Sequence, residues 1–137
     1  MRIEVGAMLA GVHLCIAGIV GSAGAHAQTV NGSIALKSGE STEVGDLYWV
    51  TNCRSLLRSP PEAEVLDGPP GVSVTVKAAM IIPRALKCAN QVAGGKLVIT
   101  AQNIEDTSYT QLTIRVTYRT RDGDRKFSRV YDLSLFP

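Results

Sequence analysis

The sequence predicts an all-β protein: a sandwich of about seven antiparallel strands that follows an N-terminal signal peptide. Three observations predict it. Segments of alternating or β-branched apolar residues recur with Gly, Pro and Asp between them. No long stretch has the 3.6-residue periodicity of an amphipathic helix. A length of 137 residues, 45% of them hydrophobic, suits one globular domain.

The first 27 residues are predicted to be a secretion signal. Val5–Val20 is almost entirely apolar or glycine, and Ala25-His26-Ala27 has the A-x-A spacing of a cleavage site. The apolar run is shorter than the roughly 20 residues that span a bilayer as a helix. We expect cleavage after Ala27, which leaves residues 28–137 without a transmembrane segment, in the periplasm or outside the cell.

The predicted cleavage removes both histidines, His13 and His26, and one of the three cysteines. Catalysis by Ser-His-Asp or Cys-His needs an imidazole base, so these mechanisms are excluded. The clusters of His and Cys that bind zinc or copper are absent from the sequence. We therefore expect no catalytic residues, no metal and no cofactor.

Cys53 and Cys88 are the cysteines that remain, and an even pair in an exported chain predicts a disulfide. The closed loop has 36 residues counting both cysteines. A loop of that size stabilises a domain by about 4 kcal/mol in the chain-entropy model. The spacing is not the C-x-x-C of redox-active pairs, so we expect a structural bridge.

Strand signals follow one another through the predicted mature domain. Gly68-Pro69-Pro70-Gly71 is expected to be a turn between two strands, and Gly94-Gly95 is expected to be another turn. The strand after Gly71 alternates apolar and polar residues, as a half-buried strand does. The expected strands are Val30–Lys37, Glu43–Thr51, Glu62–Leu66, Val72–Ile82, Lys96–Ala101, Thr110–Thr120 and Arg125–Phe136.

The dipeptide Asp122-Gly123 predicts the hairpin turn between the last two strands. A turn centred there places the apolar residues of both strands on one face of the sheet. The expected pairs are Tyr118 with Phe127, Ile114 with Tyr131, and Leu112 with Leu133. Arg129 falls on the same apolar face, and we expect its side chain to reach the end of the sheet.

The stretch from Arg115 to Arg129 contains six basic and two acidic residues, which makes it the candidate binding surface. Arg115, Arg119 and Lys126 share the polar face of the hairpin, and Arg121 and Arg125 lie at its tip. Such a positive field attracts an acidic protein, an acidic glycan or a lipid head group of the cell envelope. Nucleic acid is not expected, because no stacking aromatics are interleaved. The alternative is a solvated face that guards a sheet edge.

The neighbouring aromatic residues Tyr48 and Trp49 allow two interpretations. They are either a pair of core aromatics or an exposed binding pair.

The leader, the strand signals and the closing stretch from Tyr109 to Pro137 resemble small exported bacterial proteins with an immunoglobulin-like β-sandwich. The chain departs from immunoglobulin domains because Trp49 precedes Cys53 and because Leu86 stands where they have a tyrosine. This resemblance implies a fold and no function.

We expect a non-catalytic, exported binding or accessory protein of the cell envelope that contacts an acidic partner through the basic hairpin. One alternative is an inhibitor of an exogenous hydrolase, which would present a rigid loop to a cleft. Another is a small carboxylate-dependent hydrolase, which needs two acids in one pocket, one of them with a raised pKa. The sequence does not indicate an oligomeric state.

Overall fold

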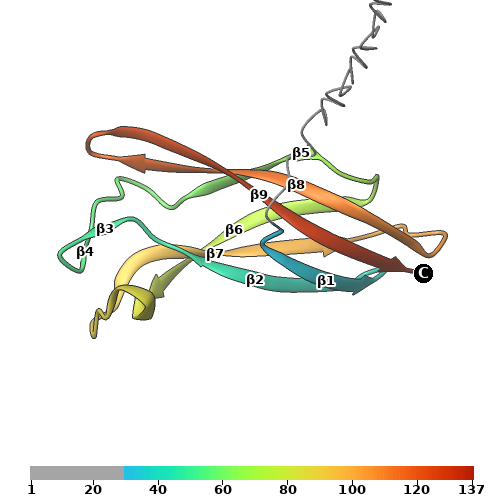
Figure 1. The fold of residues 1–137 in the computed structure, drawn as a ribbon, viewed down its shortest axis with the longest axis horizontal. Helices are drawn as coiled ribbons and strands as arrows, with labels where there is room; N and C mark the ends of the chain where they lie inside the picture. Colours follow the sequence, from blue (N-terminus) through green and yellow to red (C-terminus); the bar gives the residue numbers. More distant parts are fainter. Residues whose placement is uncertain (1–29) are drawn as a thin grey trace, which may run out of the picture.

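The computed structural model describes residues 30–137, which form an all-β structure with nine strands and one 3₁₀ turn (Figure 1). The predicted signal peptide and its cleavage site lie outside these residues. The elements are β1 (Gly32–Lys37), β2 (Ser41–Leu47), β3 (Val50–Thr51), β4 (Arg54–Ser55), β5 (Glu62–Asp67), β6 (Val72–Ile81), η1 (Arg84–Leu86), β7 (Val92–Ala101), β8 (Ser108–Thr120) and β9 (Gly123–Phe136).

Seven of the strands form two sheets that face each other (Figure 1). One sheet has the order β1-β9-β8-β5, the other has the order β2-β7-β6, and β3 and β4 form a separate short hairpin. The prediction of an antiparallel sandwich is correct for all neighbours in the two sheets except one pair. β1 runs parallel to β9, from Gly32 opposite Tyr131 to Lys37 opposite Phe136.

A hydrophobic core lies between the sheets, and inner strands of both sheets supply its most deeply buried residues. Leu97 and Ile99 of β7 and Leu112 and Ile114 of β8 have no exposed surface. The alternation predicted from the sequence produces this arrangement, because every second residue of a strand faces the same side. Burying one such side chain contributes roughly 1.5–3 kcal/mol.

The predicted strands are confirmed, but one of them is divided. The segment expected at Glu43–Thr51 contains β2, a break after Leu47, and the short β3. β3 turns into β4 through Asn52 and Cys53, whose φ angles are 51° and 59°. Positive φ at both central residues is the requirement of a type I′ hairpin turn. Asn commonly adopts such angles, whereas a cysteine in the sequence does not predict them.

The expectation of a turn at Gly94-Gly95 is wrong, because both residues lie inside β7. A Cβ atom at Gly94 would collide with the carbonyl oxygen of Leu47 in β2, and one at Gly95 would collide with Val76 of β6. The flanking strands therefore approach β7 so closely that only glycine fits. These residues mark close packing rather than a change of direction.

The predicted register of the β8–β9 hairpin is wrong by two residues. The structure pairs Thr120 with Gly123 and Val116 with Phe127, and the turn consists of Arg121 and Asp122. The Thr120 hydroxyl donates to the Gly123 carbonyl (2.6 Å) and accepts from the Asp122 N–H (3.2 Å), which fixes the turn one residue earlier than expected. A shift of two residues leaves each side chain on its predicted face.

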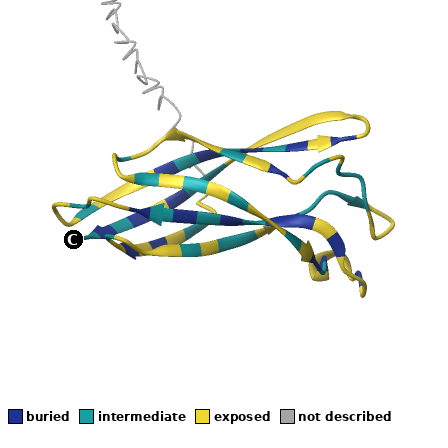
Figure 2. Ribbon diagram, turned by 180° about the vertical axis from the view of Figure 1, so that it is seen from behind, coloured by how far each residue is buried: buried dark blue, intermediate teal, exposed yellow. Residues whose placement is uncertain are grey.

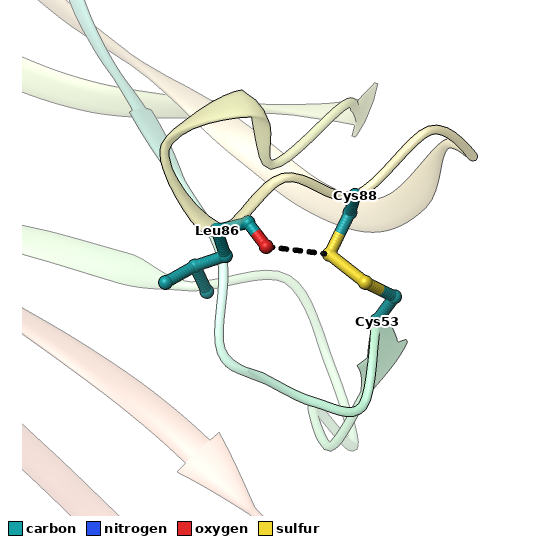
Figure 3. The surroundings of a disulfide bond; sticks show 3 residues. All are labelled: Cys53, Leu86 and Cys88. Atoms are coloured by element: carbon teal, nitrogen blue, oxygen red, sulfur yellow. Dashed lines mark hydrogen bonds between the residues drawn. A yellow bond between two sulfur atoms is a disulfide. The ribbon is translucent and has the colours of Figure 1, made fainter.

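The loops gather at two ends of the molecule (Figure 1). One end carries residues 48–61, which include β3 and β4, together with the loop 82–91 and the β8–β9 turn. We call it the disulfide end, because Cys53 and Cys88 join the first two of these segments with a Cα–Cα distance of 5.5 Å. The predicted disulfide is thus confirmed, and the Cys88 sulfur lies 3.9 Å from the Leu86 carbonyl oxygen (Figure 3). The opposite end carries three turns and the C-terminus.

We predict that the double variant Cys53→Ser/Cys88→Ser loses about 4 kcal/mol of unfolding free energy, because its unfolded chain gains the freedom of a 36-residue loop. Urea unfolding followed by the fluorescence of Trp49 measures this loss. Wild-type protein treated with reductant is the matched control and should unfold at the same urea concentration as the variant. An unfolding midpoint equal to that of the oxidised protein would contradict the prediction.

Candidate functional site

Two residues of the predicted binding surface lie in ion pairs on the outer face of the four-stranded sheet. Arg115 lies 3.4 Å from Glu64, and Arg119 lies 2.9 Å from Glu62 and 3.1 Å from Asp124. The hydrogen bond from Arg119 to Glu62 raises the pKa of that guanidinium. β5 supplies both glutamates, because it pairs with β8 in the register that sets Glu64 opposite Arg115. This face therefore carries both signs of charge.

The other three predicted residues lie on the exposed β8–β9 tip. Arg121 is in the turn, Lys126 is on the outer face opposite Thr117, and Arg125 is on the inner face opposite Tyr118. Among residues 30–137, no acidic side chain forms an ion pair with any of these three. The five predicted residues thus divide between a charge-balanced face and a positive tip.

The structure adds four basic residues that the sequence reasoning missed. Arg54 and Arg58 lie between β3 and β5, and Arg84 and Lys87 lie in the loop 82–91. All four are exposed, and none forms an ion pair within the described part of the chain. The signal available in the sequence was that segments 48–61 and 82–91 contain no acidic residue. Only the topology reveals that both segments lie at the same end as the hairpin tip (Figure 1).

Charge is therefore separated between the two ends of the molecule. Segments 48–61, 82–91 and 120–126 of the disulfide end contain seven basic and two acidic residues, and one of the two acids, Asp124, is paired with Arg119. The three turns of the opposite end, residues 38–40, 68–71 and 102–107, contain no basic residue and three acidic ones, Glu40, Glu105 and Asp106; Lys37 and Asp67 end the neighbouring strands β1 and β5. The disulfide end is consequently the most positive part of the described chain.

An apolar groove of about 460 Å³ lies beside these basic residues. Its floor is the inner face of β6 and β7, where Met80 pairs with Ala93, and its opposite wall is the segment Leu57–Pro60. Met80 is 55% exposed although it lies on the core-facing side of its strand. Figure 2 shows a related trend on β9, whose alternating buried residues give way to a continuous exposed stretch toward the tip.

Three aromatic rings form a second apolar surface at this end. The Trp49 ring centroid lies 5.5 Å from that of Tyr118 and 5.6 Å from that of Phe127. Tyr118 is buried, Trp49 is half-buried, and Phe127 is 48% exposed. Of the two interpretations of Tyr48-Trp49, the core one holds in part, because both residues are half-buried and Trp49 packs against the core; a role of the pair in binding stays a prediction.

Arg129 does not reach the end of the sheet as expected, but lies between the two sheets. A Cβ atom on Gly45 of β2 would come within 3.0 Å of its Nη1 atom, so a larger residue at position 45 would require the Arg129 side chain to shift. Burial alone would lower the pKa of Arg129, but its interactions with Tyr131 and Tyr118 outweigh that effect and raise it. Burial likewise raises the pKa of Tyr118, and the charge of Arg129 opposes part of the rise.

No family model matches the chain, and no curated protein or solved structure is significantly similar to it. Within residues 30–137, no group of three or more His, Cys, Asp or Glu side chains is placed to hold a metal ion. The same residues contain no helix that is long and apolar enough to cross a membrane. What distinguishes the disulfide end is its surface, which combines unpaired positive charge with exposed apolar side chains.

We predict that Arg129→Met raises the pKa of Tyr118 further, because the variant loses the positive charge that stabilises the phenolate. Spectrophotometric titration of the tyrosines in this variant and in Arg129→Met/Tyr118→Phe measures the shift. The folded-state pKa of Tyr118 already exceeds the ordinary value of 10.0, so its contribution to stability is complete below that pH and is lost as the pH rises above it. Tyr109→Phe is the control, because Tyr109 is 75% exposed. An unchanged or lower pKa in Arg129→Met would refute the prediction.

Proposed function

We propose that this protein is an exported, non-catalytic binding protein of the cell envelope whose disulfide end contacts an acidic partner. The observation that carries the proposal is the set of seven exposed basic residues at that end, for which the described chain supplies no ion-pair partner. The exposed groove and Phe127 add apolar surface next to this charge. Together they suit a partner that offers both acidic and apolar groups.

We also propose that the domain is an immunoglobulin-like sandwich. Two runs of its sheet order support this: β9-β8-β5 follows the order G-F-C of that fold, and β2-β7-β6 follows the order B-E-D. The first strand differs, because β1 pairs with the last strand. The disulfide differs as well, because it joins two loops rather than two strands. In this assignment residues 48–61 and the β8–β9 turn occupy the positions of loops with which immunoglobulin variable domains bind.

The proposal of binding rather than catalysis is supported by the position of the acidic residues. A carboxylate hydrolase places two acids in one cleft, where one of them is protected from water. Glu62 and Glu64 do lie close together on β5, but both are exposed and both are paired with arginines. Their arrangement balances charge on the outer face.

One observation favours inhibition of a hydrolase as a second candidate function. The β3–β4 turn is a tight, exposed hairpin tip, and the disulfide ties it to the loop 82–91. A rigid loop of this kind can enter a cleft without losing much conformational freedom. Arg54 directly follows the turn and would be the first side chain to enter.

We predict that the triple variant Arg54→Glu/Arg84→Glu/Arg121→Glu loses its partner from an envelope extract, because it reverses the charge of three separate segments of the disulfide end. The control, Arg115→Glu/Arg119→Glu, reverses charges on the outer face at residues outside the disulfide end and should retain the partner. Capture on immobilised protein, repeated with added salt, measures this difference. Circular dichroism verifies that each variant is folded.

The outcomes separate the possible surfaces. Loss in the control alone would show that the partner uses the outer face of the hairpin, as the sequence reasoning expected. Capture that neither variant changes would reject charge as the basis of binding. A hydrolase whose activity falls in the complex would favour the inhibitor function.

We predict that the exported protein has the intact mass of residues 28–137 minus two hydrogens, because the leader is removed and Cys53 and Cys88 are oxidised. Mass spectrometry after treatment with an alkylating reagent measures both. A mass that retains residues 1–27 would reject the cleavage, and two alkylated thiols would reject the bridge in the exported protein.

A further inference from the structure

The outer edge of β9 is covered over only half of its length. β1 pairs with β9 from Tyr131 to Phe136, and β8 pairs with the other edge of β9 from Gly123 to Leu135. Within residues 30–137, no strand lies along the outer edge from Gly123 to Arg129. This half of β9 leads from the middle of the sheet to the disulfide end (Figure 1).

Asn31 marks the point at which the β1–β9 ladder stops. The backbone N–H of Asn31 donates to the Val130 carbonyl at 2.7 Å, and the side-chain oxygen of Asn31 accepts from the Val130 N–H at 2.9 Å. Backbone groups alternate in direction along a strand, so those of Asp124, Lys126 and Ser128 point to the same side as those of Val130. They form an open row of donors and acceptors.

The side chains along this open stretch are basic and aromatic. Lys126 lies on the outer face, and Arg125 and Phe127 lie on the inner face, where Phe127 stacks on Trp49 at 5.6 Å. The one acid of the stretch, Asp124, is paired with Arg119. An incoming strand would therefore meet a positive charge on each face and an exposed ring on the inner face.

We propose that the open half of β9, Gly123–Arg129, binds an extended segment of the partner by strand addition, and that this segment alternates acidic and apolar residues. The proposal rests on the proposed function, because it assigns a mode of binding to the same acidic partner. Backbone hydrogen bonds to Lys126 and Ser128 hold the segment. An acidic side chain lies beside Lys126, and an apolar one covers Phe127.

A second copy of this chain is a poor occupant for the edge. Pairing two copies of β9 would bring the Arg125 and Lys126 charges of both copies together, and like charges on adjacent strands destabilise a sheet. The same charges repel basic segments, and a wholly apolar segment would leave them without a partner. The edge therefore selects for acidic ones.

The test uses the full chain and an acetylated octapeptide in which glutamate alternates with valine. We expect this peptide to bind at least tenfold more tightly than a peptide of the same charge whose amides are all N-methylated, because the second cannot donate to the edge. A peptide that alternates lysine and valine should not bind. Isothermal calorimetry measures the affinities, and hydrogen exchange at Lys126 and Ser128 should slow when the first peptide is bound.

A matched pair of protein variants tests the edge itself. Ser128→Pro removes the outward N–H without removing a β8–β9 hydrogen bond, and it should weaken peptide binding at least tenfold, whereas Ser128→Ala should stay within twofold of wild type. Should Ser128→Pro fail to fold, the comparison of the two glutamate peptides still decides the question.

The results distinguish this inference from the proposed function. Equal binding of the N-methylated and unmodified peptides would overturn strand addition and leave attraction by charge standing. Absence of peptide binding would overturn it too, and partner capture by the disulfide end would then stand or fall by its own experiment. A dimer that forms through the β9 edge in sedimentation would overturn the choice of occupant.

Discussion

The unequal pairing of β9 on its two sides is the constraint on which the rest of the structure depends. β8 follows β9 almost to the end of its 14 residues, whereas β1 has only six residues and covers the second half. Where β9 has two neighbours, its core-facing side chains, such as Leu133 and Leu135, are buried. Where it has one, every residue from Gly123 to Ser128 is exposed. The second half of β9 therefore contributes to the core, and its first half offers exposed surface to a partner.

The strands were predictable because period-2 patterning is a local property and the core depends directly on it. What failed was the geometry between strands. Asp122-Gly123 is a strong turn signal, yet the Thr120 hydroxyl bonds the backbone on the far side of the turn and moves it by one residue. The glycines of β7 look like a turn in the sequence, because the close approach of Leu47 and Val76 is tertiary information.

The sequence predicted the part of the candidate site whose residues are close together in the chain. Arg121, Arg125 and Lys126 are neighbours in one hairpin, so their proximity follows from the hairpin alone. The ion pairs of Arg115 and Arg119 depend on β5, about 50 residues earlier, and the register of that pairing is not readable from either segment. Arg54 and Arg84 were missed for the same reason: their common position at the disulfide end is a result of the sheet order.

The separation of charge between the two ends affects how fast the protein meets a charged partner in the correct orientation. Positive and negative groups at opposite ends of an elongated domain give it an electric dipole along its axis. Near an anionic surface, the molecule rotates until the disulfide end leads, so collisions start in the orientation that places β3, β4 and the open edge of β9 first. Orientation of this kind acts only within a Debye length, about 8 Å at physiological ionic strength, and salt would therefore slow encounter before it loosened an established complex.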